Sequence, residues 1–326
     1  MSFLFKPKPK SPQLIVQSVR DSLYRIDGPD WKKATDEVTK TLQILREMLK
    51  EGDGTHLATQ VAQEIHKADL LQLLILKLPS LEFETKKDVV SIFGLLLRSQ
   101  LGHRHPTVDY LSENRTRCSP YFTGTFDNPE IALNCGTILK DCVKYPPLTK
   151  VLLDSPEFYK FFKYIQSDTF DISSNAFSTF KDILTRQKEL SSTFLVKEYD
   201  KFFEHFYQLL MSANYVTKRQ SLKLLSEILM SRTNFEVMTR FIGCPENLKT
   251  IMNLLHDPSK SVQIEAYHVF KVFVANPHKP PAIAEILRKN QEKLVAYLNN
   301  LSDGRNDEMK FNEEKTYLLR IIHQLT

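Results

Sequence analysis

The sequence predicts an all-α protein, a right-handed α-solenoid of armadillo- or HEAT-like helical repeats. Three observations support this prediction. Helix start signals and helical spacing of apolar residues run almost from end to end, strand-type alternation is nearly absent, and one segment recurs at a spacing of 41 to 45 residues. Periodic apolar residues are the main sequence signal of helices, and a fixed repeat of this length is typical of helical arrays.

Cap residues followed by proline mark where several helices begin. Ser11 precedes Pro12, and the same pairing opens DNPEIALNCG (127–136) and DSPEFYKFFKYI (154–165). A capping side chain satisfies free backbone N–H groups, and proline is tolerated at the first helical position. In the segment 34–49 the apolar residues then fall on one helix face: Ala34, Val38, Leu42, Leu45 and Leu49.

Five segments align with one another without gaps. The last four begin with a small residue, and all five have a large apolar residue four positions later: IFGLLLRS (92–99), CGTILKDC (135–142), AFSTFKDI (176–183), SLKLLSEI (221–228) and AYHVFKVF (266–273). Their starting points are separated by 43, 41, 45 and 45 residues. We interpret the small residue as the point where adjacent helices approach and the large one as the filling between layers.

This repeat organises most of the chain into one expected domain, residues 11–326, behind a flexible tail at 1–10. The repeats lie near 83–126, 127–168, 169–212, 213–257 and 258–300, with helical caps at both ends. Stacked repeats of this kind share a continuous core and present one helix of each repeat on an inner surface. The polar, proline-containing stretch 112–126 breaks the pattern and is expected to form a loop or a poorly packed helix.

Composition excludes several classes of protein. Net charge is +5 and the basic residues are not concentrated, so a nucleic-acid partner is not expected. The N-terminus lacks the apolar core of a signal peptide, and the most apolar run, 69–81, is interrupted by a lysine and a proline. Four cysteines form no CxxC pair, and we expect Cys135 and Cys142 to be buried small apolar residues. A cytoplasmic protein without membrane insertion is therefore expected.

No pattern in the sequence predicts catalysis, a cofactor or a metal site. The usual nucleophile, phosphate-binding, zinc and EF-hand motifs are absent. His103 and His105 form the one close histidine pair, with Asp109 as the only further ligand type nearby. Because a metal site needs several ligands at defined spacing, we interpret this pair as part of a polar turn between helices.

One predicted helix, NYVTKRQSLKLLSEIL (214–229), has an unusual face. Tyr215, Arg219 and Lys223 are spaced four apart, outside the apolar stripe, whereas Lys218 falls inside it and must extend its ammonium out of the core. Taken alone, such a face is typical of solvated charged surface. One repeat earlier, however, stands Phe170, and two equivalent aromatics suggest a ladder along the inner surface. We therefore favour a protein-binding groove.

Six long runs of the chain share one resemblance: KKDVVSIF (86–93), PEIALNCG (129–136), YVTKRQSLKLL (215–225), CPENLKTIMNLL (244–255), HVFKVFVANP (268–277) and FNEEKTYLL (311–319). They resemble the calcium-binding-protein-39 family, also called the mouse-protein-25 family (Hym in fungi). The resemblance implies a non-enzymatic, armadillo-like scaffold that binds sterile-20-class (germinal-centre) kinases or related pseudokinases and stabilises their active conformation. It also implies a place in polarity and morphogenesis signalling, and in animals a heterotrimer with a second kinase.

The resemblance further implies two partner-binding sites. On the concave surface, the residues expected to contact a kinase are Phe170, Tyr215, Arg219, Lys223, Lys249 and Met252. Near the C-terminal repeats, a pocket for a short Trp-Glu-Phe-type tail is expected to involve Arg232, Phe235 and Lys289, with Lys289 facing the tail's carboxylate.

Two other readings stay open. A generic armadillo-type adaptor would grip extended peptides, often with a ladder of asparagines and tryptophans, but the chain's single tryptophan, Trp31, lies outside the aligned helices. A helical-repeat nucleic-acid binder would need base-stacking side chains in each repeat, and the repeats that begin at 92 and 135 have none.

Overall fold

The computed structural model describes residues 11–51, 56–114, 125–301 and 308–325. The expected flexible tail, 1–10, lies outside these residues, as does most of the stretch 112–126. The chain divides into two compact units, Met1–Leu190 and Ser191–Thr326, and each is described by itself.

The described helices of the first unit are 6 to 21 residues long. They are α1 (Pro12–Arg25), α2 (Trp31–Glu51), α3 (His56–Lys67), α4 (Leu70–Lys77), α5 (Phe83–Arg98), α6 (Pro106–Glu113), α8 (Pro129–Cys142), α9 (Pro146–Leu153), α10 (Lys160–Ile165) and α11 (Phe170–Thr185), with single 3₁₀ turns at Leu78–Ser80, Thr125–Asp127 and Pro156–Tyr159. The next helix, α12 (Lys188–Lys197), crosses the boundary between the units.

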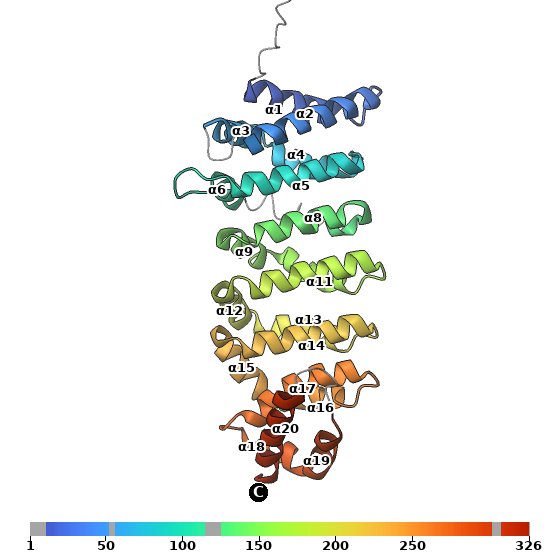
Figure 1. Ribbon diagram of the computed structural model, residues 1–326, viewed down its shortest axis with the longest axis vertical. Helices are drawn as coiled ribbons and strands as arrows, with labels where there is room; N and C mark the ends of the chain where they lie inside the picture. The colour runs from blue at the N-terminus through green and yellow to red at the C-terminus, as the bar shows by residue number, and fades with distance from the viewer. Residues whose placement is uncertain (1–10, 52–55, 115–124, 302–307, 326) are drawn as a thin grey trace, which may run out of the picture. The chain divides into compact units, whose positions relative to one another are not determined.

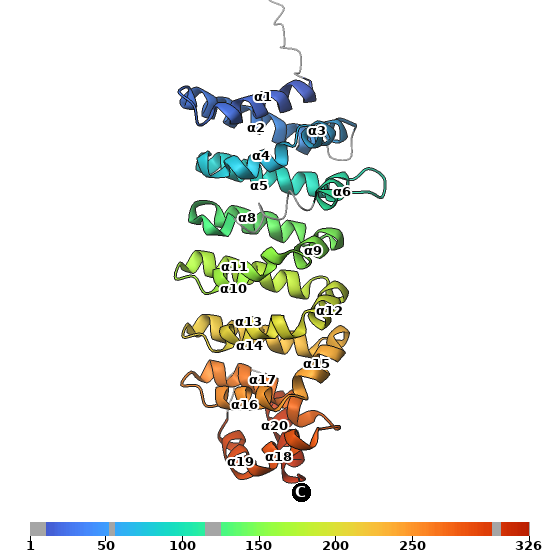
Figure 2. The ribbon, with the colours of Figure 1, turned by 180° about the vertical axis from the view of Figure 1, so that it is seen from behind.

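Within the first unit, α2, α5, α8 and α11 pack one against the next as successive layers, which both views show (Figures 1 and 2). The large residue of each aligned segment is completely buried between these layers: Leu96, Leu139 and Phe180. The small residues Cys135 and Ala176 are buried as well. The roles that the repeat predicts for these positions are therefore confirmed.

The second unit, taken by itself, is also built from packed helices. Its helices are α13 (Tyr199–Leu210), α14 (Tyr215–Met230), α15 (Phe235–Ile242), α16 (Pro245–Leu254), α17 (Lys260–Ala275), α18 (Pro281–Lys289), α19 (Gln291–Asn300) and α20 (Glu308–His323), with a 3₁₀ turn at Arg232–Asn234. Helix α14 packs on α17 and α17 packs on α20. Ser221, Leu225, Ala266 and Phe270, which the repeat alignment predicts to be interior, are all completely buried.

The prediction of an all-α helical-repeat fold is confirmed. No strand occurs among the described residues, where the only β-type contact is an isolated bridge between Leu101 and Arg104. Helices α5, α8, α11, α14 and α17 begin at residues 83, 129, 170, 215 and 260, close to the residues where the expected repeats begin. The expectation of one continuous domain stays a prediction.

Two smaller expectations are also confirmed. Cys135 and Cys142 are 1% and 2% exposed. The histidine pair lies in the turn between α5 and α6, where the His105 ring contacts the carbonyl of Leu97 (3.2 Å) and the edge of Tyr145 (5.0 Å between ring centroids).

Candidate functional site

The unusual face belongs to α14 and is set by the residue that caps this helix. The Oδ1 atom of Asn214 accepts hydrogen bonds from the backbone N–H groups of Val216 (2.9 Å) and Thr217 (3.3 Å). Because this side chain satisfies two N–H groups that lack helical partners, α14 begins at Tyr215. Residues four apart then lie on one side of the helix.

Tyr215, Arg219 and Lys223, which we call the α14 face, all reach solvent. Tyr215 is 44% exposed and the Arg219 side chain 34%, while Lys223 is exposed. The three side chains that the sequence placed outside the apolar stripe are therefore outside the core, one turn apart.

Arg219 does not stand alone on this face. Its Nε atom lies 3.6 Å from an Oε1 atom of Glu265 on α17, a carboxylate on a residue only 5% exposed. The distance is that of an ion pair rather than a hydrogen bond, and Nε has no hydrogen-bond partner among the described residues. The guanidinium is thus held mainly by charge, against an acid from the next layer.

Tyr215 also interacts with α17, the helix that carries Glu265. Interaction of its phenol with the Ser261 side chain, helped by the neighbouring Arg219 cation and by Ser259, lowers the pKa of Tyr215 below its ordinary value. The phenol ring of Tyr215 and the guanidinium of Arg219 therefore lie together in the first turns of α14. Tyrosine and arginine are the residue types that most often dominate binding at protein interfaces.

Lys218, the residue that the helical wheel places inside the apolar stripe, is accommodated by an ion pair. Its Nζ atom lies 2.8 Å from Oδ2 of Asp257, and the two side chains are only 22% and 10% exposed. Burial by itself raises the pKa of the Asp257 carboxyl, but the hydrogen bonds from Lys218 and from the Ser259 N–H outweigh it and lower that pKa. The charge of Lys218 is thus used in an ion pair with the turn that precedes α17, and Lys218 is not part of the α14 face.

Two further residues expected on the concave surface lie on α16. Lys249 is exposed and forms an ion pair with Glu246 (3.3 Å), and Met252 is half-buried. Helix α16 packs on α17, the helix that supplies Glu265.

In the first unit, Phe170 is the first residue of α11 and is 69% exposed. The structure adds two aromatics in the same position of stacked helices. Trp31 opens α2 and is 54% exposed, and Phe83 opens α5 and is 71% exposed. An ammonium lies over each ring, from Lys32 and Lys87. The repeat alignment starts at residue 92, so it includes neither Trp31 nor Phe83.

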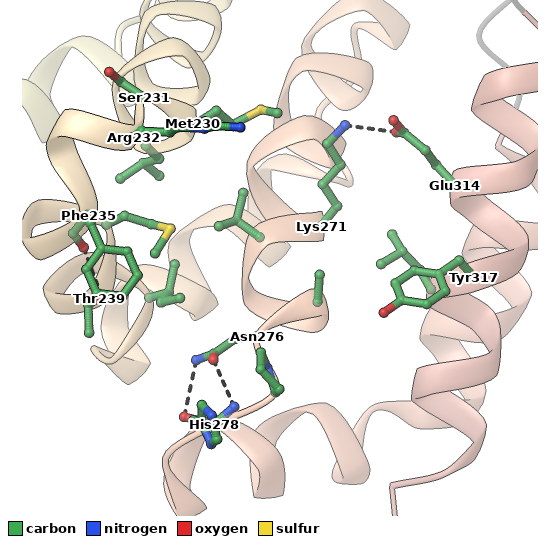
Figure 3. A pocket seen from close by; sticks show the side chains of 17 residues that line it. Met230, Ser231, Arg232, Phe235, Thr239, Lys271, Asn276, His278, Glu314 and Tyr317 are labelled. Carbon is green, nitrogen blue, oxygen red and sulfur yellow. Dashed lines mark hydrogen bonds and ion pairs between the residues drawn. The ribbon is translucent and has the colours of Figure 1, made fainter. Parts of the chain in front are cut away.

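The second unit also contains a cavity of about 710 Å³ (Figure 3). Three parts of the unit supply its walls: the end of α14 with α15, the end of α17 with the loop after it, and α20. Its lining residues are Leu229, Met230, Ser231, Arg232, Phe235, Met238, Thr239, Ile242, Lys271, Val272, Ala275, Asn276, Pro277, His278, Glu314, Tyr317 and Leu318. Arg232 and Phe235, expected in the tail pocket, both line it.

Lys289, the third residue expected in the tail pocket, is not among the lining residues. Its Nζ atom is exposed on α18 and pairs with Glu285 (2.8 Å). Instead, the cavity holds Lys271, whose Nζ atom lies 2.8 Å from an Oε2 atom of Glu314 (Figure 3). Sequence reasoning missed both residues of this pair, although both stand inside the family-like runs 268–277 and 311–319.

The chemistry of the cavity suits an apolar group with a negative charge beside it. Phe235, Met238 and Tyr317 are among a lining that is mostly apolar, which is typical of pockets that bind side chains or small ligands. The loop below is fixed by two hydrogen bonds between Asn276 and the backbone of His278, at 2.9 and 3.3 Å. Arg232 is exposed at the rim and can receive a carboxylate.

Two properties of the described residues concern metal ions and membranes. No group of three or more histidine, cysteine or acidic side chains there could hold a metal ion. No described helix is long and apolar enough to cross a membrane.

The amino-acid sequence of the chain is similar to those of several known proteins along almost its full length. A calcium-binding protein 39-like protein of Homo sapiens is 47% identical, over 99% of this chain and 97% of its own length. A Mo25-like protein of Schizosaccharomyces pombe is 44% identical over the whole of both chains, and the conidiophore development protein hymA of Emericella nidulans is 35% identical over 100% and 94%.

Among solved structures, a computationally designed armadillo repeat protein is similar, with a TM-score of 0.47 and 14% identity over 81% of this chain and the whole of its own. The family described as Mo25-like matches residues 3–326. With a match of this length and relatives at up to 47% identity along the full chain, the protein belongs to the Mo25-like family.

Proposed function

We propose that this protein is a non-catalytic scaffold that binds a sterile-20-class (germinal-centre) kinase, or a related pseudokinase, and stabilises its active conformation. The observation that carries the proposal is the α14 face, where the exposed Tyr215 adjoins an Arg219 held in place by the buried carboxylate of Glu265. A surface that is fixed before binding loses less entropy when a partner docks.

We also assign to partner binding the residues that the family resemblance implies. They are Phe170 in the first unit, and Tyr215, Arg219, Lys223, Lys249 and Met252 in the second. The first is 69% exposed, the lysines are exposed and Met252 is half-buried, so each can contribute to a contact. An aromatic and cationic surface complements a partner helix that carries acidic and apolar side chains.

Activation without chemistry is a shift in population. A kinase samples active and inactive placements of its regulatory helix, and a scaffold that binds only the active one shifts the balance by its difference in affinity. A difference of about 100-fold between the two states is worth about 2.7 kcal/mol, enough to convert a minor active state into the major one. No catalytic residue of the scaffold is required.

The cavity gives a second contact. We assign it to a short tail of Trp-Glu-Phe type, whose aromatic rings fit a lining that includes Phe235, Met238 and Tyr317 and whose negative charge suits Arg232. A partner that occupies both sites gains from effective concentration, because the second contact becomes intramolecular once the first has formed. Assembly with a second kinase into a heterotrimer, cytoplasmic location and a role in polarity signalling belong to the same proposal.

The test is a paired capture experiment. Wild type and Arg219→Ala are used to capture kinases from extract of the source cells, the bound kinases are identified, and their activity is assayed with each purified protein. Lys293→Ala, which removes an exposed lysine of α19 that lines neither site, is the matched control. We expect the control to behave as wild type and Arg219→Ala to lose binding and activation.

Equal activation by Arg219→Ala and wild type would contradict the proposal for the α14 face. Recovery of varied extended peptides, with no kinase, would favour the generic armadillo-type adaptor instead.

A further inference from the structure

Three stacked helices of the first unit begin at one edge of its layers. Helices α5, α8 and α11 pack one on the next, and the helices that follow the first two, α6 and α9, pack together at the opposite edge (Figures 1 and 2). The Nδ2 atom of Asn175, early in α11, donates a 2.9 Å hydrogen bond to the carbonyl of Ala132, early in α8. A Cβ atom at Gly94, late in α5, would lie 3.2 Å from Oδ2 of Asp141, late in α8. The three starts therefore lie nearly level with one another.

Each of these starts combines an exposed apolar side chain with an exposed carboxylate. We call these six residues the first-unit edge: Phe83 and Glu84 of α5, Leu133 and Glu130 of α8, and Phe170 and Asp171 of α11. Their apolar side chains are 71%, 53% and 69% exposed, in that order. Glu84 pairs with Lys87 (2.8 Å), whose Nζ atom also lies 4.2 Å from the centre of the Phe83 ring. The carboxylates of α8 and α11 form no ion pair with another described residue.

Helix formation alone does not explain this edge. An acidic residue in the first turn stabilises a helix through its dipole, but α14 and α17 in the second unit form without one. The dipole also gives no reason for a phenylalanine at the first helical position, where Phe83 and Phe170 leave most of their rings in water. Exposed apolar side chains that are rimmed by charged ones are typical of interaction sites.

The spacing of the layers selects the conformation of a ligand. Packed helices lie about 8–10 Å apart. A polyproline II segment has three residues per turn and rises about 3.1 Å per residue, so every third side chain points the same way, about 9 Å farther along. A segment in this conformation can therefore place one side chain on each of α5, α8 and α11. The carboxylate beside each apolar residue is complementary to a basic side chain.

We propose that the first-unit edge binds a partner segment of polyproline II conformation in which an apolar and a basic residue recur at every third position. The apolar residues of the segment pack on the exposed apolar side chains of the edge, and its basic residues pair with the carboxylates. At α5 the incoming cation displaces Lys87 from Glu84. This inference rests on the proposed function, because Phe170 belongs to the partner surface, and it adds the chemistry of the segment that the first unit binds.

The test uses the full-length protein and a fluorophore-labelled peptide of four Pro-Leu-Lys repeats, with fluorescence anisotropy at low salt. One comparison peptide has Glu in place of each Lys, and the other has the composition of the first with all leucines and all lysines grouped together. The Pro-Leu-Lys peptide should bind about tenfold more tightly than either, since each exposed charge pair contributes up to about fivefold. Its affinity should fall as salt is added, because salt screens exposed charges.

Charge variants assign the basic residues of the peptide to the edge. Glu130→Gln/Asp171→Asn should weaken binding of the Pro-Leu-Lys peptide about fivefold or more. The reversed variant Glu130→Lys/Asp171→Lys should instead prefer the Pro-Leu-Glu peptide. Asp154→Asn, which removes an exposed carboxylate just after α9, is the matched control and should leave the affinities unchanged.

Apolar variants show whether more than charge is involved. Phe83→Ala/Phe170→Ala should weaken binding about tenfold or more, because aromatic side chains often contribute most at binding surfaces. Leu101→Ala removes a 54% exposed apolar side chain just beyond the end of α5, and it should bind as wild type does. Thermal denaturation of each variant checks that the fold is kept.

The outcomes distinguish this inference from the proposed function. Equal binding of the Pro-Leu-Lys and grouped peptides would show only a general attraction between charges and would overturn the inference, as would unchanged affinity in Phe83→Ala/Phe170→Ala. If kinases are captured and activated in the Arg219→Ala comparison but the peptide is not bound, the edge is wrong and the proposed function stands. If the peptide binds as expected and no kinase is captured, the proposed function is wrong and the edge binds such segments from other partners.

Discussion

The pairing of Arg219 with Glu265 predicts that stability and partner binding can be separated by mutation. Arg219→Ala removes the cation 3.6 Å from a carboxylate that is almost completely buried. Removing one member of a fully buried ion pair costs about 3–5 kcal/mol, whereas an exposed pair contributes about 0.2–1 kcal/mol. Because the Arg219 side chain is 34% exposed and no hydrogen bond joins the pair, we expect a loss of about 1 kcal/mol in the free energy of unfolding.

Binding should suffer more than stability. Arginines that anchor an interface typically contribute about 2 kcal/mol or more, so the dissociation constant for the captured kinase should rise about 30-fold in Arg219→Ala. Adding Glu265→Gln removes the carboxylate that Arg219→Ala leaves without this partner. The double variant should therefore recover most of the lost stability and none of the lost affinity.

Urea denaturation followed by circular dichroism gives the stabilities, and titration of the kinase with each purified variant gives the affinities. Glu265→Gln alone is the control for the loss of one charge without change of side-chain shape. If the double variant recovers affinity together with stability, Arg219 acts through folding and the reasoning is refuted.

Two predictions concern the first unit. Gly136→Ala in α8 should lower the free energy of unfolding by about 1–3 kcal/mol, although alanine normally favours a helix interior. The added Cβ would overlap the Asn175 side chain, which donates a 2.9 Å hydrogen bond to the Ala132 carbonyl. Asn175→Ala should therefore restore stability to the Gly136→Ala variant in thermal denaturation, and no recovery would contradict this explanation. Burial lowers the pKa of His66 to about 4, so the unfolded chain binds one more proton below pH 6.5, and stability should fall by about 3 kcal/mol as pH decreases from 6.5 to 4. His66→Gln should flatten the pH profile of unfolding in that window, and an unchanged profile would show that another group causes it.

The repeat could be predicted from the sequence because each layer needs a small and a large apolar residue at the same two positions of one helix. Ser221 and Leu225 stand at the same positions as Ala176 and Phe180, and the structure buries all four. The start of α14 was readable for a similar reason, since a polar cap residue and a four-residue spacing are features of one segment.

The residues that these side chains contact in other helices could not be predicted from the sequence. Lys218 looks misplaced on a helical wheel, and its counter-ion Asp257 comes from a turn 39 residues later. The cavity joins Arg232 to Glu314 through the fold alone, and no spacing in the sequence predicts that α20 supplies the third wall. Contacts of this kind depend on how layers stack, which neither composition nor helical periodicity encodes.

The most direct test of the central claim is a titration of a captured sterile-20-class kinase with the purified scaffold. Kinase activity on a generic substrate is measured with ATP, and phosphorylation of the scaffold is followed in parallel. The proposed function predicts saturable activation that reaches its plateau at one scaffold per kinase, does not require phosphorylation of the scaffold and is lost with Arg219→Ala. Kinase activity that stays constant while the two proteins form a stable complex would contradict it.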